Sequence, residues 1–188
     1  DTKVTYLEFQ KNVNRISNLL REIGVRKGDH VAVFLSNCVE YAYLYHSLGK
    51  CGAVMIPINP FVRGEPLQYI LKHSEAKYLI TSSELFTEKI SRIIDVLDDL
   101  KAVAFVDNRQ DLPRIDSIQF SEYKRFPSYF EPYEEVTGDD IQGIWYTSGT
   151  TGMPKGAVIN HKTYIYRVLY FADYFGLTPS DVIYYILP

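Results

Sequence analysis

Residues 30–58, HVAVFLSNCVEYAYLYHSLGKCGAVMIPI, decide the fold. The stretch begins and ends with near-continuous apolar runs, HVAVFL and VMIPI, which have the length and composition of strands buried on both faces of a sheet. The segment between them is long enough for a helix, with Asn37 and Glu40 as its expected cap and Gly52 as its end. A strand, a helix and a strand in this order predict a right-handed crossover between parallel strands.

The same alternation extends on both sides of this stretch. Near the start, Thr5 and Glu8 form a capping box before an apolar stripe at helical spacing, which Gly24 ends. Further along, the pattern predicts helices over 64–73 and 84–97 and strands over 77–81 and 102–106. Helices that alternate with short strands predict the α/β class, with a mostly parallel sheet flanked by helices.

Two polar stretches connect the later elements. Residues 107–116 include a proline and predict a surface loop, whereas residues 126–140 combine two prolines, two tyrosines and five acidic residues and predict an extended connector. The chain of 188 residues contains no internal repeat. We therefore expect one domain, with a weaker seam near Asp107.

The composition indicates a soluble globular protein, because 46% of the residues are hydrophobic and 23% are charged. The net charge of -3 gives no electrostatic reason to expect a nucleic acid or an anionic membrane as a partner. The apolar runs are too short to cross a bilayer, and the start lacks a signal-peptide pattern. Cys38 and Cys51 form no CxxC pair, so we expect reduced cysteines rather than a metal site with His46, and a cytoplasmic location.

The chemistry is expected in residues 144–158, IWYTSGTTGMPKGAV. Gly149, Gly152 and Gly156 allow positive φ angles and a close approach of the backbone to a ligand, and the neighbouring hydroxyl and N–H groups can face phosphate oxygens. Lys155 adds a full positive charge. A plain turn between two strands needs neither the lysine nor so many hydroxyls, so the stretch predicts a polyphosphate cradle. Its spacing matches neither a Walker A loop nor a Rossmann G-x-G-x-x-G.

Residues 146–156, YTSGTTGMPKG, resemble the phosphate-loop signature of the adenylate-forming superfamily, which includes acyl-CoA synthetases, luciferases and peptide-synthetase adenylation domains. The resemblance covers nearly the whole chain, and its further segments are 5–9, 24–32, 52–60, 73–77, 160–161, 176–177 and 187–188. Thr150 and the Pro-Ile-Asn-Pro of residues 57–60 favour fatty-acid or other carboxylic acid–CoA ligases over amino-acid-adenylating domains.

The resemblance implies a reaction in two halves. A carboxylate attacks the α-phosphate of ATP to give an acyl-adenylate and pyrophosphate, and a thiol, usually coenzyme A, then displaces AMP. Positioning and electrostatic stabilisation of the departing pyrophosphate would supply the catalysis. By position, Lys155 and Thr150 are the catalytic candidates, and Thr150 is also the candidate ligand of Mg²⁺. The residues implied to contact the β- and γ-phosphates are Thr147, Ser148, Gly149, Thr150, Thr151, Gly152 and Lys155.

The family pattern continues past residue 188, with a glutamate for Mg²⁺, an aspartate for ribose and a small carboxy-terminal domain that carries a lysine. We therefore expect residues 1–188 to be part of an N-terminal AMP-binding domain that is inactive alone. A homodimer is a possible oligomeric state that the sequence leaves open. The resemblance places the acid pocket mainly in segments after the phosphate loop. A medium- or long-chain fatty acid is expected first. Aryl acids, carnitine-type acids, amino-acid adenylation and a non-catalytic nucleotide-binding module stay open.

Three further features next to the loop have structural interpretations. His161 is expected to be a capping or solvent-facing residue of a helix after Asn160, with a role in lining the site as the alternative. Trp145 is expected to pack in the core. The tyrosines at helical spacings predict a semi-buried helix face, and they are Tyr164, Tyr166, Tyr170 and Tyr174.

Overall fold

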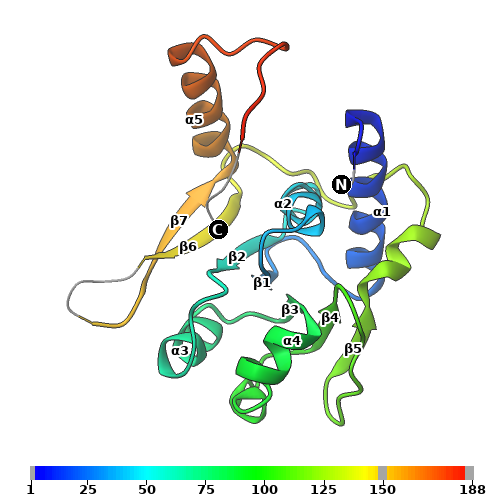
Figure 1. Ribbon diagram of the computed structural model, residues 1–188, viewed down its shortest axis with the longest axis vertical. Coiled ribbons are helices and arrows are strands. Elements are labelled where there is room, and N and C mark those ends of the chain that lie inside the picture. The colour runs from blue at the N-terminus through cyan, green and yellow to red at the C-terminus, as the bar shows by residue number, and fades with distance from the viewer. Residues whose placement is uncertain (1–2, 148–151, 185–188) are drawn as a thin grey trace.

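Within residues 3–147 and 152–184, the part of the chain that this computed structural model describes, seven strands form one sheet in the order β5-β4-β3-β1-β2-β6-β7 (Figure 1). All neighbouring strands are parallel except β6 and β7, which form an antiparallel hairpin. The predicted α/β class and mostly parallel sheet are thereby confirmed. The strands are β1 (His30–Phe34), β2 (Val54–Ile58), β3 (Tyr78–Thr81), β4 (Ala102–Phe105), β5 (Asp116–Gln119), β6 (Ile141–Thr147) and β7 (Lys155–Asn160).

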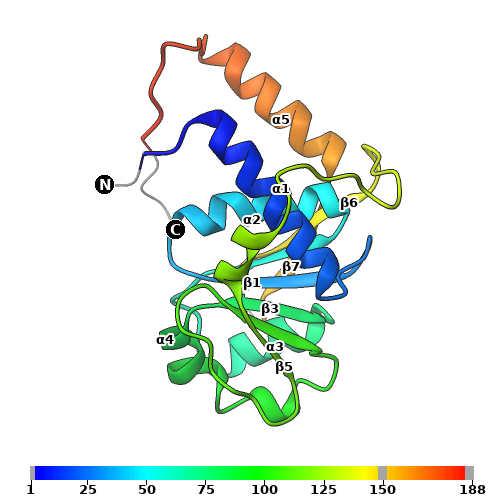
Figure 2. The same ribbon diagram turned by 90° about the vertical axis from the view of Figure 1, so that its right-hand side faces the viewer.

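Helices cover both faces of this sheet (Figure 2). Val31 and Val33 of β1 point to one face, and Ala32 and Phe34 point to the other, so successive residues of one strand enter two separate cores. This arrangement explains the continuous apolar run, because a strand covered on both faces needs no polar side. The helices are α1 (Tyr6–Glu22), α2 (Val39–Cys51), α3 (Glu65–His73), α4 (Ser83–Leu85) and α5 (His161–Tyr174), with short η helices at Phe86–Ile90, Ile94–Val96 and Phe120–Arg125.

Two of the helix ends predicted from the sequence are confirmed, and one predicted cap is wrong. The capping box is present, since the Glu8 backbone N–H donates to the Thr5 hydroxyl at 3.2 Å and the Thr5 N–H donates to the Glu8 carboxylate at 2.9 Å. Gly52 ends α2 at φ 66°, as predicted. The cap predicted from Asn37 and Glu40 is wrong, because Cys38 is the N-cap and makes no side-chain cap hydrogen bond. Glu40 instead lies in the first turn, where a carboxylate favours the helix dipole.

Two predicted elements differ from the structure. The helix expected over 84–97 is broken into α4, a π-helical turn at Phe86–Ile90 and a 3₁₀ turn at Ile94–Val96. The Thr87 and Ser91 hydroxyls donate to carbonyls four residues earlier, at 2.8 and 2.7 Å, which is a contact that bends helices. Strand β5, which begins at Asp116, was not predicted, because the polar composition of this edge strand has no apolar pattern.

The connector between residues 126 and 140 lies against α1. Four side chains of the first 27 residues hold it, all by donating to its backbone carbonyls: Asn14 to Ser128, Asn18 to Pro127 and Tyr129, Arg21 to Glu131, and Lys27 to Glu135. The connector thereby carries the chain from the β5 edge of the sheet back to β6, which pairs with β2. An extended segment without its own secondary structure is satisfied here by a neighbouring helix.

Candidate functional site

Strands β6 and β7 form a hairpin at one edge of the sheet, and its far end extends away from the other strands (Figure 1). Thr147 and Lys155 form its last described pair, with the Thr147 hydroxyl 3.5 Å from the Lys155 carbonyl oxygen. Both residues are exposed, as is Gly152. The predicted phosphate contacts of Ser148, Gly149, Thr150 and Thr151 lie outside the described residues.

Two glycines of the hairpin are required by packing. A Cβ at Gly143 would lie 2.6 Å from the Trp145 ring and 2.7 Å from the Met55 carbonyl oxygen. A Cβ at Gly156 would lie 2.7 Å from Ile144. Gly156 lies in β7 without a positive φ, so the prediction that its freedom serves a ligand is corrected. Its position opposite Tyr146 demands the absence of a side chain.

The strand that leads into the loop is held by α3. The Tyr146 hydroxyl lies 2.8 Å from His73 Nδ1, and the His73 ring stacks on Tyr69 with the centroids 4.9 Å apart. Burial raises the pKa of Tyr146, so its hydroxyl stays protonated and available as a donor. This contact ties the residue immediately before Thr147 to the helix on one face of the sheet.

The base of the hairpin is held by Asp140. Its carboxylate lies 2.8 Å from Lys27 Nζ and accepts hydrogen bonds from the Thr137 N–H at 2.6 Å and the Thr137 hydroxyl at 3.1 Å. The hydrogen bond from Lys27 and those from Thr137 lower the pKa of Asp140 to about 2. The Asp140 carbonyl also accepts from the His161 N–H at 3.1 Å, which fixes the start of α5 beside the start of β6.

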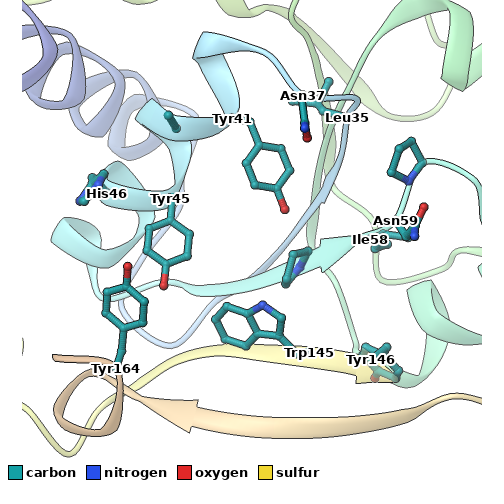
Figure 3. A pocket seen from close by; sticks show the side chains of 13 residues that line it. Leu35, Asn37, Tyr41, Tyr45, His46, Ile58, Asn59, Trp145, Tyr146 and Tyr164 are labelled. Atoms are coloured by element: carbon teal, nitrogen blue, oxygen red, sulfur yellow. The ribbon is translucent and has the colours of Figure 1, made fainter. Parts of the chain in front are cut away.

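A cleft of about 550 Å³ lies between α2, α5, β6 and the carboxyl ends of β1 and β2 (Figure 3). Carboxyl ends of parallel strands are where open α/β sheets bind ligands. Among the described residues, no Asp, Glu, Lys or Arg lines the cleft. Five aromatic side chains line it together with Asn37 and Asn59, and these five are Tyr41, Tyr45, Trp145, Tyr146 and Tyr164.

Trp145 lines this cleft, so its predicted packing in the core is wrong. The indole is half-buried and lies over Gly143, two residues earlier on the same face of β6, with its other side toward the cleft. Sequence reasoning also missed Tyr41, Tyr45 and Asn59 as lining residues. The position of Asn59 directly after β2 was a usable signal, because strand ends of a parallel sheet converge, whereas Tyr41 and Tyr45 lie in α2, the helix that follows β1.

Helix α5 differs from its prediction. Asn160 is the N-cap and accepts from the Thr163 N–H at 2.8 Å, so His161 is neither the cap nor solvent-facing but half-buried in the first turn. Tyr164 is half-buried and lies 5.2 Å from Tyr45 between ring centroids. The predicted semi-buried tyrosine face is wrong for the other three tyrosines, which are 63%, 69% and 70% exposed at Tyr166, Tyr170 and Tyr174.

Residues 3–147 and 152–184 were searched for groups of metal-binding side chains and for membrane-spanning helices. In that part, no three His, Cys, Asp or Glu side chains gather into a group that could hold a metal ion. Cys38 is exposed and Cys51 is half-buried, and burial raises the pKa of Cys51 to about 12. No helix in the same part is long and apolar enough to cross a bilayer.

Comparison with known proteins assigns the family. The whole chain, residues 1–188, matches the model of the AMP-binding enzymes, and the chain belongs to this family. It is 33% identical over 188 residues to a crotonobetaine/carnitine–CoA ligase of Escherichia coli O1:K1 / APEC, a match that covers 99% of this chain. The chain spans only 36% of the length of that relative.

Two solved structures are similar to the chain in both fold and sequence. An anthranilate CoA ligase in complex with anthranoyl-AMP has a TM-score of 0.82 and 26% identity, over 92% of this chain and 32% of that chain. A long-chain-fatty-acid-CoA ligase from Archaeoglobus fulgidus has a TM-score of 0.81 and 27% identity, over 95% of this chain and 34% of that chain. The resemblance to adenylate-forming enzymes is therefore confirmed.

Proposed function

We propose that the protein containing this chain activates a carboxylic acid with ATP and transfers the acyl group to coenzyme A. The acid carboxylate attacks the α-phosphate to form an acyl-adenylate and pyrophosphate, and the thiol of coenzyme A then displaces AMP. The observation that supports the proposal is that Thr147 and Lys155, which flank most of the motif in the sequence, form the last described pair of the β6–β7 hairpin in a chain of the AMP-binding enzyme family.

In this proposal Lys155 provides the main positive charge for the departing pyrophosphate. Its side chain is exposed at the end of the hairpin, directly opposite Thr147, so both can reach one polyphosphate. The donors of Ser148, Gly149, Thr151 and Gly152 complete the contacts implied by the family pattern. Thr150 is the candidate ligand that this chain would supply to Mg²⁺, and a metal held there would neutralise phosphate charge. Donors fixed before the reaction stabilise developing charge without reorganising.

The aromatic cleft is our candidate for one wall of the acid site. Trp145 and Tyr146 line it and directly precede Thr147, so an acyl group in the cleft would lie close to the phosphate loop. A cleft lined by many aromatic rings and by His46, but by no Asp, Glu, Lys or Arg of the described residues, suits an apolar acyl group, because burying a charge without a partner is costly. A fatty acid, expected from the sequence, is therefore our first candidate substrate.

An acid with a trimethylammonium group is the second candidate. Aromatic faces attract quaternary ammonium ions, and Tyr41, Trp145 and Tyr164 approach the cleft from three different elements (Figure 3). The named substrates of the relative from Escherichia coli, crotonobetaine and carnitine, belong to this class of acid. The same rings would stabilise a bound fatty acid only by burying its apolar surface.

Acid-dependent ATP–pyrophosphate exchange by the full-length protein tests both proposals. The panel contains fatty, aryl, amino and trimethylammonium acids, with the 188-residue chain as a control that we expect to be inactive. Exchange with one acid class identifies the substrate, and Lys155→Ala is expected to reduce it by ~10²–10³-fold, the loss typical of one removed charge-stabilising group. Nucleotide binding without exchange for any acid would instead favour a non-catalytic nucleotide-binding module.

A further inference from the structure

A row of ring contacts runs from α3 to the β6–β7 hairpin. The Tyr69 ring stacks on the His73 imidazole, with the centroids 4.9 Å apart and the planes 27° apart. The imidazole meets the Tyr146 ring edge to face, with 5.9 Å between the centroids. The Tyr146 ring in turn lies against Gly156, where an added Cβ would be 3.3 Å from Tyr146 Cζ. Three side chains and one glycine therefore connect a helix to both strands of the hairpin.

The position of each member in its own element produces this row. Tyr69 and His73 are four residues apart in α3, so their side chains are neighbours on one face of the helix. Tyr146 and Gly156 lie directly opposite each other in the antiparallel pair. A side chain at position 156 would collide with Ile144 and crowd the Tyr146 ring. The glycine therefore leaves the ring the space from which it reaches α3.

One hydrogen bond fixes the end of the Tyr146 side chain. The Tyr146 hydroxyl lies 2.8 Å from His73 Nδ1. Burial raises the pKa of Tyr146, so the hydroxyl keeps its proton. A neutral imidazole that carries its own proton on Nε2 accepts at Nδ1. Because the hydroxyl is the atom of the ring farthest from the backbone, this bond sets the direction of the whole side chain.

The contact lies beside both described ends of the predicted phosphate loop. Thr147 follows Tyr146 and Lys155 precedes Gly156, and the two form the last described pair of the hairpin. Within the described residues, no register pair joins β6 to β2 beyond Gly143. The end of the hairpin therefore extends past its ladder to the parallel sheet, and the contact with α3 supplies a tie in that part.

We propose that His73 is a positioning residue for the phosphate loop. Its hydrogen bond to Tyr146 holds Thr147 and Lys155 in one place relative to the sheet before ATP binds. Donors and charges that are fixed in advance stabilise phosphate charge without reorganising. His73 acts through Tyr146 and not by contact with the nucleotide. This inference rests on the proposed function, because it assigns the loop to ATP.

ATP affinity and the kinetics of ATP–pyrophosphate exchange by the full-length protein test this role. His73→Leu removes the acceptor and is expected to weaken ATP binding and to raise KM for ATP by ~3–10-fold, the effect of one neutral hydrogen bond. KM for the acid is expected to change less. His73→Asn places an amide oxygen where Nδ1 lies, so it is expected to restore most of the affinity. Gln68→Leu makes the same replacement elsewhere on α3 and is the matched control, with no effect expected.

The double variant His73→Leu/Tyr146→Phe decides whether the effect passes through the hydrogen bond. Tyr146→Phe keeps the ring and removes only the hydroxyl. A shared bond predicts that the double variant binds ATP little more weakly than either single variant, because the same interaction is lost in each. Fully multiplied effects would overturn the proposal, as would an equal loss in His73→Asn and His73→Leu.

Hydrogen–deuterium exchange without nucleotide gives a readout that is independent of activity. His73→Leu is expected to speed exchange of the amides at the end of β6 and the start of β7 by ~3–10-fold and to leave β1 unchanged. Equal acceleration in β1 would mean a general loss of stability and would overturn the positioning role.

The wild-type protein separates this inference from the proposed function. A wild-type protein that binds ATP but shows no acid-dependent exchange would contradict the proposed function, while the ATP affinities of the His73 variants would still decide the positioning role. Unchanged ATP affinity in His73→Leu would overturn the inference and leave the proposed function as it stands. A wild-type protein that binds no ATP would overturn both.

Discussion

Gly143 shows at the scale of one residue how packing constrains the hairpin. Its missing side chain lets β6 approach the Met55 carbonyl oxygen of β2 and leaves room for the Trp145 indole. Two strands of the sheet and one wall of the cleft therefore meet at a single glycine. The backbone oxygen cannot move aside as the end of a flexible side chain could.

We predict that Gly143→Ala destabilises the protein by ~1–3 kcal/mol, the usual result of forcing an extra carbon into a packed site. Trp145 is the only tryptophan of the 188 residues, so urea unfolding of this chain followed by its emission measures both stability and the ring's surroundings. Gly152→Ala is the control for stability, because nothing lies within 4 Å of its added Cβ. Equal midpoints for the two variants would refute the packing argument.

His161 predicts a pH dependence of stability. Burial lowers its pKa in the folded protein, so the unfolded chain binds more protons between that lowered pKa and the ordinary value of about 6.5. The free energy of unfolding is thus highest above about pH 6.5 and falls as the pH drops toward the lowered pKa. Denaturant titrations at pH 7.5 and 5.5 measure the difference, and His161→Gln should reduce it. The same pH difference in the variant would contradict this assignment.

At the scale of elements, the connector of residues 126–140 depends on α1 for its conformation. Asn18 is 3% exposed, and its amide donates to the carbonyls of Pro127 and Tyr129 at 3.1 and 2.8 Å. Its oxygen accepts from Arg21 at 2.6 Å. Helix α1 therefore sets the path by which the chain reaches β6 and the candidate site.

Asn18→Ala is predicted to cost ~1–3 kcal/mol in the free energy of unfolding, because the connector's carbonyls lose buried donors. Chemical denaturation measures this value, and proteolysis should show earlier cleavage within residues 126–140. Lys11→Ala removes an exposed side chain from the same helix and is expected to stay within ~0.5 kcal/mol of the wild type. A connector that resists cleavage in Asn18→Ala would show that other contacts hold it.

Elements with a clear apolar period could be predicted, and elements held by individual contacts could not. The runs around Val33 and Ile56 predict buried strands because both faces are covered. Strand β5 lacks such a period, and the helix over 84–97 is broken by hydroxyl contacts that the apolar pattern does not record. For the site, the motif indicated Lys155 and Thr147. The cleft depends on how Tyr41 and Trp145 come together from distant segments, which only the fold determines.

For the molecule as a whole, helix α5 is an exposed apolar feature of the described residues. None of its residues is buried, and Figure 1 shows it standing out from the sheet beyond β7. Ile165 and Leu169 are 53% and 59% exposed, and Tyr170 is 69% exposed. Contiguous apolar surface of this kind indicates an interaction site or a tendency to associate.

We predict that a polypeptide of residues 1–188 self-associates through α5. Sedimentation velocity over a range of concentrations should show a rising average mass, and Ile165→Lys/Leu169→Lys should reduce the association. Phe61→Lys changes an isolated apolar residue that is 78% exposed and serves as the control, with no effect expected. A monomer at all concentrations, or equal effects of both changes, would contradict a role for α5.

We propose that the full-length protein forms an acyl-adenylate at the predicted phosphate loop between β6 and β7. The most direct measurement incubates the full-length protein with ATP and the acid that supports exchange, and identifies the products by mass spectrometry before and after coenzyme A is added. We predict an acyl-adenylate and pyrophosphate first, then acyl-CoA and AMP in equal amounts, with both steps greatly weakened in Lys155→Ala. Formation of ADP and phosphate instead of AMP, or undiminished adenylate in Lys155→Ala, would contradict this mechanism.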